Sequence, residues 1–166
     1  MTAEPSHGIP ANCSASPRSK VGVIAGGETL FDYRDYRNRF DTLAANLSVN
    51  PHVLGPVDHD ALPSLVSAAS AFGFVSTKEG FGLAALEALA AEVPVVARPL
   101  PVLEEILGRH VRYGHDPSSI AAALVEAITD GPLPDAPEVA QRYTWPKAAQ
   151  AHLDLYGLLK TKSAEA

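Results

Sequence analysis

The sequence predicts an α/β protein with a doubly wound, mostly parallel sheet. Short runs of β-branched and apolar residues, apolar on both faces as in buried parallel strands, alternate along the chain with segments of helical periodicity. Glycine, proline and helix-capping residues separate these segments, which indicates short turns. With 166 residues the chain has room for one domain with a sizeable core.

Each expected element has its own signal. Strands are expected at 21–27, 52–57, 71–76, 93–98 and 111–114, where short apolar runs end in glycine or polar residues. Helices are expected at 40–47, 62–69, 83–91, 101–107 and 117–130 and from 145 onward, where apolar residues recur at helical spacing. In the helix at 117–130, Asp116 can act as the cap, Pro117 fits the first turn and Gly131 can end the helix. Asp60 is expected to cap the helix at 62–69.

The two ends of the chain differ from this pattern. Residues 1–20 are rich in Pro, Ser and Ala and contain no apolar stretch, so they are predicted to be disordered and not a secretory signal. Residues 161–166 are predicted to be a disordered tail, which leaves 21–160 as the folded domain. The single cysteine, Cys13, excludes a disulfide framework within the chain and fits a cytoplasmic location.

Charge and composition exclude several functions. The formal net charge of -6 at pH 7 argues against nucleic acid or an anionic membrane as the main partner. No apolar run reaches the ~18 residues that a membrane span needs. The six histidines lack the spacing of metal ligands, so no metal is expected. A polar cluster at 33–37 either lines one side of a cleft or begins a solvated helix.

The stretch KEGFGLAALEALAAEVPVV, residues 78–96, carries the strongest site signal. It follows the third expected strand, and ligands of open α/β sheets bind at the carboxyl ends of strands. Gly80 and Gly82 allow backbone to approach a ligand, and the helix that follows favours an anion such as phosphate at its N-terminus. Glu87 is the single charge of a helix expected to be covered nearly all round, so its carboxylate needs a partner, for which a polyol is suitable. The alternative is structural: glycines that serve only the turn, and a solvated glutamate.

The same stretch resembles the donor-binding signature of retaining, family 4 (group 1) glycosyltransferases of the two-Rossmann-domain GT-B type. The resemblance is carried by Glu79-Gly80-Phe81-Gly82-Leu83, then Glu87-Ala88-Leu89-Ala90, then Val93-Pro94-Val95-Val96. It continues on both sides and covers roughly residues 21–160. Residues 25–37 are similar to the version of the family's second strand and following loop that is found in actinobacterial members. The resemblance implies the Rossmann-like, C-terminal domain of such an enzyme.

The resemblance also implies roles for these residues. In the family, the residue that matches Glu87 binds the ribose of a nucleotide. The residue that matches Glu79 contacts donor-sugar hydroxyls near the reacting carbon, so Glu79 is the catalytic candidate. Backbone N–H groups around Gly80, Phe81, Gly82 and Leu83 hold the diphosphate. The donor substrate is a nucleotide-diphospho-sugar, no metal is needed, and the sugar is transferred with retention.

Two parts of the family pattern have no counterpart in this sequence. One is the N-terminal Rossmann domain, which supplies the acceptor site and could be provided by a separate chain. The other is a pair of basic residues, an Arg and a Lys, that binds the diphosphate in the family. Arg18 and Lys20 of this sequence do not match that pair. Two functions are therefore expected: the donor-binding half of a glycosyltransferase, truncated at its N-terminus and inactive alone, or a non-catalytic module that binds nucleotide or protein.

Two structural expectations follow from the resemblance. Glu92 stands where the family commonly has a helix-ending glycine, so it should adopt a positive φ or shift the helix end. The family's first strand, which lies in the middle of the sheet, is the missing one, so 21–27 and 71–76 should flank the gap unless they pair directly. The loss of a central ladder of hydrogen bonds should leave the isolated chain marginally stable or prone to aggregation.

Overall fold

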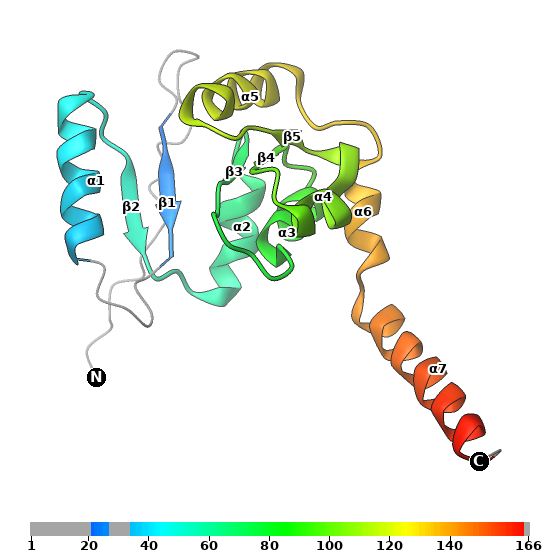
Figure 1. Ribbon diagram of the computed structural model, residues 1–166. Helices are drawn as coiled ribbons and strands as arrows, with labels where there is room; N and C mark the ends of the chain where they lie inside the picture. Colours follow the sequence, from blue (N-terminus) through cyan, green and yellow to red (C-terminus); the bar gives the residue numbers. More distant parts are fainter. Residues whose placement is uncertain (1–20, 27–33, 165–166) are drawn as a thin grey trace, which may run out of the picture. The chain divides into compact units, whose positions relative to one another are not determined.

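The computed structural model describes residues 21–26 and 34–164, with side-chain environments up to residue 160. The predictions for residues 1–20, for Cys13 and for the last two residues lie outside this range. The chain divides into two compact units, residues 1–58 and 59–166, and each is described by itself. The α/β class is confirmed: all strand pairs are parallel, and helices connect successive strands (Figure 1).

The first unit is one strand–helix–strand motif. It contains β1 (Val23–Ala25), α1 (Arg34–Asn46) and β2 (His52–Gly55). Strand β1 pairs with β2, and the register shifts between Ile24 and Ala25. No described residue of this unit is buried, and the side chains of Val23 and Ile24 are 49% and 41% exposed. Such exposure is unusual for β-branched residues of a parallel strand, which are ordinarily covered on both faces.

Helix α1 begins at Arg34, inside the polar cluster at 33–37. Tyr36 is exposed, and Arg37 forms an ion pair with Asp41 one turn further on, with Nε and the carboxylate 3.1 Å apart. Because both charged side chains are about half exposed, the pair contributes little to stability. These features favour the solvated helix start over a cleft-lining cluster.

The second unit is a three-stranded parallel sheet covered by helices. Its first half contains α2 (Leu62–Ser67), β3 (Phe72–Phe74), α3 (Leu83–Ala90), β4 (Val95–Ala97) and α4 (Pro101–Leu107). Its second half contains β5 (Arg112–Tyr113), α5 (Pro117–Asp130), α6 (Ala136–Arg142) and α7 (Trp145–Ala164). Two 3-10 turns, His59–Ala61 and Gly108–His110, precede α2 and β5.

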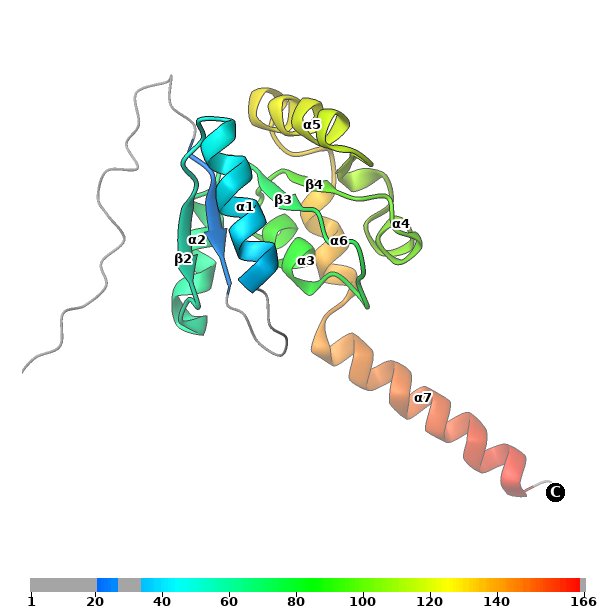
Figure 2. The same cartoon turned by 60° about the vertical axis from the view of Figure 1, so that its left-hand side comes forward.

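The sheet of this unit has helices on both faces. Its strand order is β3-β4-β5. Along β4, the side chains of Val95 and Ala97 pack with residues of α3, α4 and α6, while Val96 packs with Ala123 and Ala127 of α5. The alternation follows from the two-residue period of a strand. It places α5 on one face and the other three helices on the opposite face, which both views of the ribbon show (Figures 1 and 2). The prediction of a doubly wound arrangement is confirmed.

Capping residues explain where helix α5 begins and ends. Asp116 accepts the N–H of Ser119 at 2.9 Å, and the Ser119 hydroxyl accepts the N–H of Asp116 at 3.1 Å, which forms a capping box. Gly131, at φ 78°, ends the helix as predicted. The prediction that Asp60 caps α2 is wrong. Ala61 occupies that position without a side-chain hydrogen bond, because His59–Ala61 forms a 3-10 turn that leads into the helix.

Three further findings correct or refine the sequence predictions. The five strands form two separate sheets, of two and three strands, and not the single sheet that direct pairing of 21–27 with 71–76 would give. Helix α6 was not predicted. Helix α7 continues to Ala164, so residues 161–164 are helical where a disordered tail was expected. Within the described residues, no helix is both long and apolar enough to cross a membrane.

Candidate functional site

The predicted site forms a loop and a helix start at the carboxyl end of β3. Strand β3 ends at Phe74, the chain crosses the loop 75–81, and α3 starts at Leu83 with Gly82 as its N-cap. The helix therefore begins where the sequence predicts. Arg98, the residue after β4, donates its backbone N–H to the carbonyl of Phe74 at 3.3 Å, so the ends of two neighbouring strands meet at this edge.

The two glycines of the loop have different roles. Gly82 is buried and has φ 95°, in the left-handed region that non-glycine residues rarely adopt. A Cβ atom on Gly82 would lie 2.7 Å from Cδ2 of Leu103, in α4. A Cβ on Gly80 would meet nothing within 4 Å. Gly82 is thus required by conformation and by space, whereas Gly80 is required by neither.

The N-terminus of α3 presents backbone N–H groups without a capping side chain. The carbonyl of Gly82 accepts the N–H groups of Ala85 at 3.1 Å and Leu86 at 3.2 Å. The N–H groups of Leu83 and Ala84 lie in the first turn, where a helix provides no internal acceptor, and the Gly82 cap has no side chain to supply one. A helix start of this kind attracts an anion, because its free N–H groups and the helix dipole act together.

Glu79 lies in the same loop, and its carboxylate is partly buried. Its Oε1 accepts the N–H of Gly80 at 3.0 Å and the N–H of Phe81 at 3.4 Å. The structure therefore brings the acidic candidate and the predicted backbone donors together within one short loop. The second carboxylate oxygen, Oε2, has capacity for further hydrogen bonds from a hydroxyl group.

Glu87 lies on an exposed stripe of α3. Leu83, Glu87 and Ala90 are exposed and share one face, while the buried residues of the helix are Ala85, Leu86, Ala88 and Leu89. The expectation that α3 is covered nearly all round is therefore wrong for this stripe, and the carboxylate reaches solvent without a buried partner. Its exposure agrees with the alternative of a solvated glutamate, and it also leaves the carboxylate accessible to a ligand, so its role in ribose binding stays a prediction.

Phe81 makes an aromatic contact that the sequence analysis missed. Its ring and that of Tyr143 lie with centroids 5.3 Å apart and planes at 87°, an edge-to-face arrangement. Tyr143 is the C-cap of α6, more than sixty positions later in the chain. No local pattern in the sequence links two residues so far apart, so only the packing of α6 reveals the contact.

Two basic residues belong to this edge of the sheet, Lys78 in the loop and Arg98 directly after β4. Lys78 is exposed. Arg98 is partly exposed, but its Nε is buried and has no hydrogen-bond partner within the described part of the chain. A buried unpaired N–H is costly. Arg98 was not among the sequence candidates.

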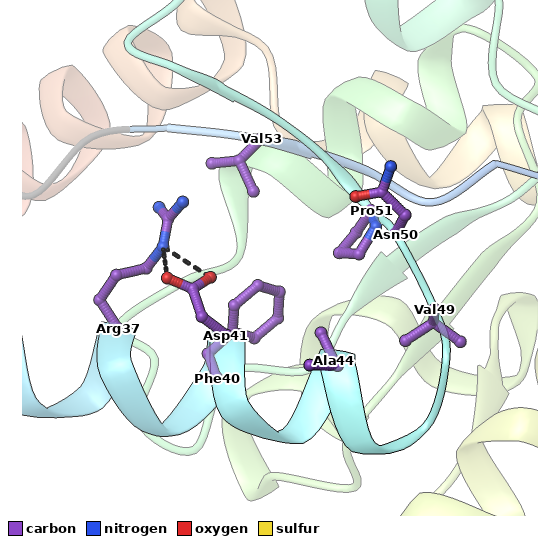
Figure 3. Close-up of a pocket in the computed structure, with 9 residues that line it drawn as sticks. Arg37, Phe40, Asp41, Ala44, Val49, Asn50, Pro51 and Val53 are labelled. Atoms are coloured by element: carbon purple, nitrogen blue, oxygen red, sulfur yellow. Dashed lines mark hydrogen bonds and ion pairs between the residues drawn. The ribbon is translucent and has the colours of Figure 1, made fainter.

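A pocket of about 440 Å³ lies in the first unit, between α1 and β2 (Figure 3). Apolar side chains make up most of its lining, and the Arg37–Asp41 ion pair lies at one end. The lining residues are Arg37, Phe40, Asp41, Ala44, Ala45, Val49, Asn50, Pro51 and Val53. It contains Arg37, from the polar cluster at 33–37, and no residue of the loop 75–81 or of α3. Since this unit has no buried residue among those described, we attribute the pocket to loose packing of α1 on β2.

Comparison with known protein families shows to which family the fold and the motif belong. Residues 19–142 match the family described as Glycosyl transferases group 1, which is more than half of the chain and includes the whole loop and α3. The chain belongs to the group 1 glycosyltransferase family. The family resemblance stated from the motif is confirmed at this level.

Curated relatives of this group 1 chain agree. It is 32% identical over 146 residues to an uncharacterized glycosyltransferase of Methanocaldococcus jannaschii, covering 81% of this chain and 36% of the relative. It is also 32% identical over 136 residues to a D-inositol 3-phosphate glycosyltransferase of Corynebacterium urealyticum, covering 75% and 32%. The group 1 chain thus spans about a third of the length of these relatives.

Solved structures support the fold. A sucrose-phosphate synthase from Thermosynechococcus elongatus superposes with a TM-score of 0.69 at 24% identity, over 84% of this group 1 chain and 38% of the synthase. A glycosyltransferase involved in avilamycin A biosynthesis superposes with a TM-score of 0.57 at 21% identity, over 82% and 43%. At these identities the likeness concerns the fold, which agrees with the predicted GT-B class.

Proposed function

We propose that this chain binds a nucleotide-diphospho-sugar and forms the donor-binding half of a retaining glycosyltransferase. The observation that carries the proposal is the arrangement at the end of β3. The Glu79 carboxylate, the free N–H groups at the start of α3 and the exposed Glu87 all belong to one loop and the helix that follows it.

The chemistry of the loop fits the parts of such a donor. Diphosphate oxygens accept hydrogen bonds from the N–H groups of Leu83 and Ala84, and the helix dipole stabilises the negative charge that develops on the leaving diphosphate. The Glu87 carboxylate accepts hydrogen bonds from the two ribose hydroxyls. Glu79 accepts hydrogen bonds from the donor sugar. The proposal requires no metal ion, because the helix start provides the electrophilic contacts.

Acceptor binding is assigned to residues outside the matched segment, on this or a separate chain. We therefore expect the isolated chain to bind nucleotide without transferring or hydrolysing a nucleotide sugar. We expect this to take place in the cytoplasm, where nucleotide sugars are available. A purified chain that turned over UDP-glucose or GDP-mannose unaided would contradict the donor-binding-only assignment.

Binding of UDP, GDP and ADP, measured by isothermal titration calorimetry, tests the donor site. Glu87→Gln should weaken the preferred nucleotide roughly ten- to hundredfold, because it replaces charge-assisted hydrogen bonds worth about 1.5–3 kcal/mol. Glu92→Gln is the matched control, since Glu92 is an exposed glutamate just beyond the other end of α3 and should have no effect.

The corresponding 2′-deoxynucleotide makes this test specific for the ribose. If Glu87 binds the 2′-hydroxyl, Glu87→Gln should weaken the deoxynucleotide much less than the ribonucleotide, so the two changes are not additive. Full additivity would refute the ribose role. Absence of binding by all three nucleotides at millimolar concentration would refute the donor-binding function.

A second candidate function is a non-catalytic module that binds a nucleotide or another protein. The observation that favours it is the exposed apolar face of α7 formed at helical spacing by Trp145, which is 88% exposed, and by Leu153 and Tyr156, which are each more than 60% exposed. Patches of this kind are typical of protein interaction surfaces. Oligomeric state by light scattering, with and without nucleotide, distinguishes a protein-binding module from a nucleotide-binding one.

A further inference from the structure

The loop at the helix start has little side-chain anchoring. Phe81 stands between Gly80 and Gly82, so it provides the one side chain of these three residues. The carboxylate of Glu79 accepts the N–H groups of Gly80 and Phe81. The partly exposed ring of Phe81 is in edge-to-face contact with Tyr143. Such aromatic pairs are favourable beyond the area that they bury.

Tyr143 is held by a well-packed helix. Its N–H donates to the carbonyl of Ala140 at 3.1 Å, which closes the end of α6. Helix α6 is anchored by Ala136 and Val139, which are 1% and 0% exposed and belong to the same buried cluster as residues of α3. The ring of Tyr143 therefore starts from a fixed backbone, next to the helix whose N-terminus Phe81 precedes.

The connection after Tyr143 is also fixed. The Nζ of Lys147, in the first turn of α7, donates to the carbonyl of Gln141 in α6 at 2.7 Å. This bond spans the two residues between the helices, Tyr143 and Thr144, and restricts the turn in which Tyr143 lies. The aromatic contact thus joins the glycine-containing loop to a helix that is anchored in the buried core of the same unit.

We propose that Tyr143 is a positioning residue of the donor site. Its ring holds Phe81 in place, and Phe81 in turn fixes the direction of the N–H groups at the start of α3. Tyr143 acts through Phe81 and does not touch the donor. This inference rests on the proposed function, because it concerns the accuracy with which that site binds a diphosphate.

The test compares three variants of the full chain. Tyr143→Leu removes the ring and keeps an apolar side chain, Tyr143→Phe keeps the ring, and Trp145→Leu removes a neighbouring aromatic residue that is 88% exposed. Affinities for UDP, GDP and ADP are measured by calorimetry. Tyr143→Leu should weaken binding about two- to tenfold, the factor expected from the loss of one aromatic pair. Tyr143→Phe and Trp145→Leu should bind as the wild type does.

A second readout does not depend on the ligand. Amide hydrogen exchange across residues 80–86 should be faster in Tyr143→Leu, because the first turn of α3 opens more often, while exchange in β4 and α5 should be unchanged. Tyr143→Phe should restore wild-type exchange. A purely structural role of Tyr143 would instead accelerate exchange throughout the unit.

Each other outcome has a definite meaning. If Tyr143→Leu changes neither the affinity nor the exchange of 80–86, the positioning role is overturned. If Tyr143→Phe behaves like Tyr143→Leu, the hydroxyl and not the ring contact is responsible, which also overturns it. If the wild type binds none of the three nucleotides, the proposed donor binding fails, and the exchange measurement alone decides whether Tyr143 orders the loop.

Discussion

Replacing Glu92 with glycine should stabilise the protein, because Glu92 adopts a conformation that favours glycine. Glu92 follows the C-cap of α3 and has φ 58°. The N–H of Glu92 donates to the carbonyl of Leu89 at 3.0 Å, and the N–H of Val93 donates to the carbonyl of Ala88 at 2.9 Å. These two bonds define a Schellman motif, whose left-handed position is most often glycine.

The expected magnitude follows from two opposing terms. A residue with a Cβ atom in the left-handed region costs about 1–2 kcal/mol. Glycine removes this strain but loses about 0.5–1 kcal/mol through its greater freedom in the unfolded chain. The Glu92 side chain is exposed and, in the described part of the structure, makes no hydrogen bond or ion pair, so nothing else is lost. The net gain should be about 0.5–1 kcal/mol.

Thermal unfolding followed by circular dichroism measures this gain. For a chain of this size, 1 kcal/mol corresponds to about 2–4 °C in melting temperature. Glu92→Ala is the control, because alanine removes the carboxylate and keeps the Cβ atom, and it should not stabilise. A glycine variant that melts at or below the wild-type temperature, or an alanine variant that gains as much as glycine does, would refute the conformational explanation.

Three further predictions concern the two glycines of the loop, the hydroxyl of Tyr113 and the helix cap at Asp116. Gly82→Ala should destabilise the protein by about 2 kcal/mol or more, since it combines positive φ with a steric clash. Gly80→Ala should change the melting temperature by little, because a Cβ atom there meets nothing within 4 Å. Equal effects of the two substitutions on the melting temperature would contradict the difference between the two glycines. Tyr113→Phe should lose about 1 kcal/mol, because the single hydroxyl hydrogen is shared between the carbonyls of Leu103 and Gly108. Burial raises the pKa of Tyr113 to about 12, so the wild type should lose stability between pH 10 and 12 and the variant should lack this loss, which denaturant unfolding at several pH values will show. The hydrogen bond from the Ser119 N–H lowers the pKa of Asp116, so Asp116→Ala should lower the melting temperature at neutral pH. The difference from wild type should shrink as the pH falls below 3.8 and the carboxylate is protonated, and a difference that stayed constant over that range would contradict a charged cap.

Most elements of the fold could be predicted because their signals are local. The capping box at Asp116, the glycine at 131 and the proline at 101 mark helix ends within a few residues of sequence, and the structure places those ends as expected. Glu92 was predicted from one departure from a family pattern, and its positive φ is confirmed. These features depend on backbone chemistry that a short segment determines by itself.

The missed features depend on packing between distant segments. Helix α6 lies in a stretch with three prolines at 132, 134 and 137, which resembles a loop. Pro137 lies in the first turn of the helix, where its missing N–H is no loss, and burial of Val139 stabilises the short helix. The exposed stripe at Glu87 was missed for a similar reason, because the apolar composition of α3 does not show which of its faces is covered.

The difference between Gly80 and Gly82 limits how this loop can change over evolutionary time. At position 82, both the backbone conformation and the side chain of Leu103 disfavour any other residue, so a substitution there requires a compensating change in α4. At position 80 a side chain can be added into open space without backbone strain. New chemical groups can therefore enter the loop on the N-terminal side of Phe81, beside the carboxylate of Glu79, while the start of the helix keeps its shape. A family of such loops can diversify in what it contacts at one end without altering the backbone donors at the other.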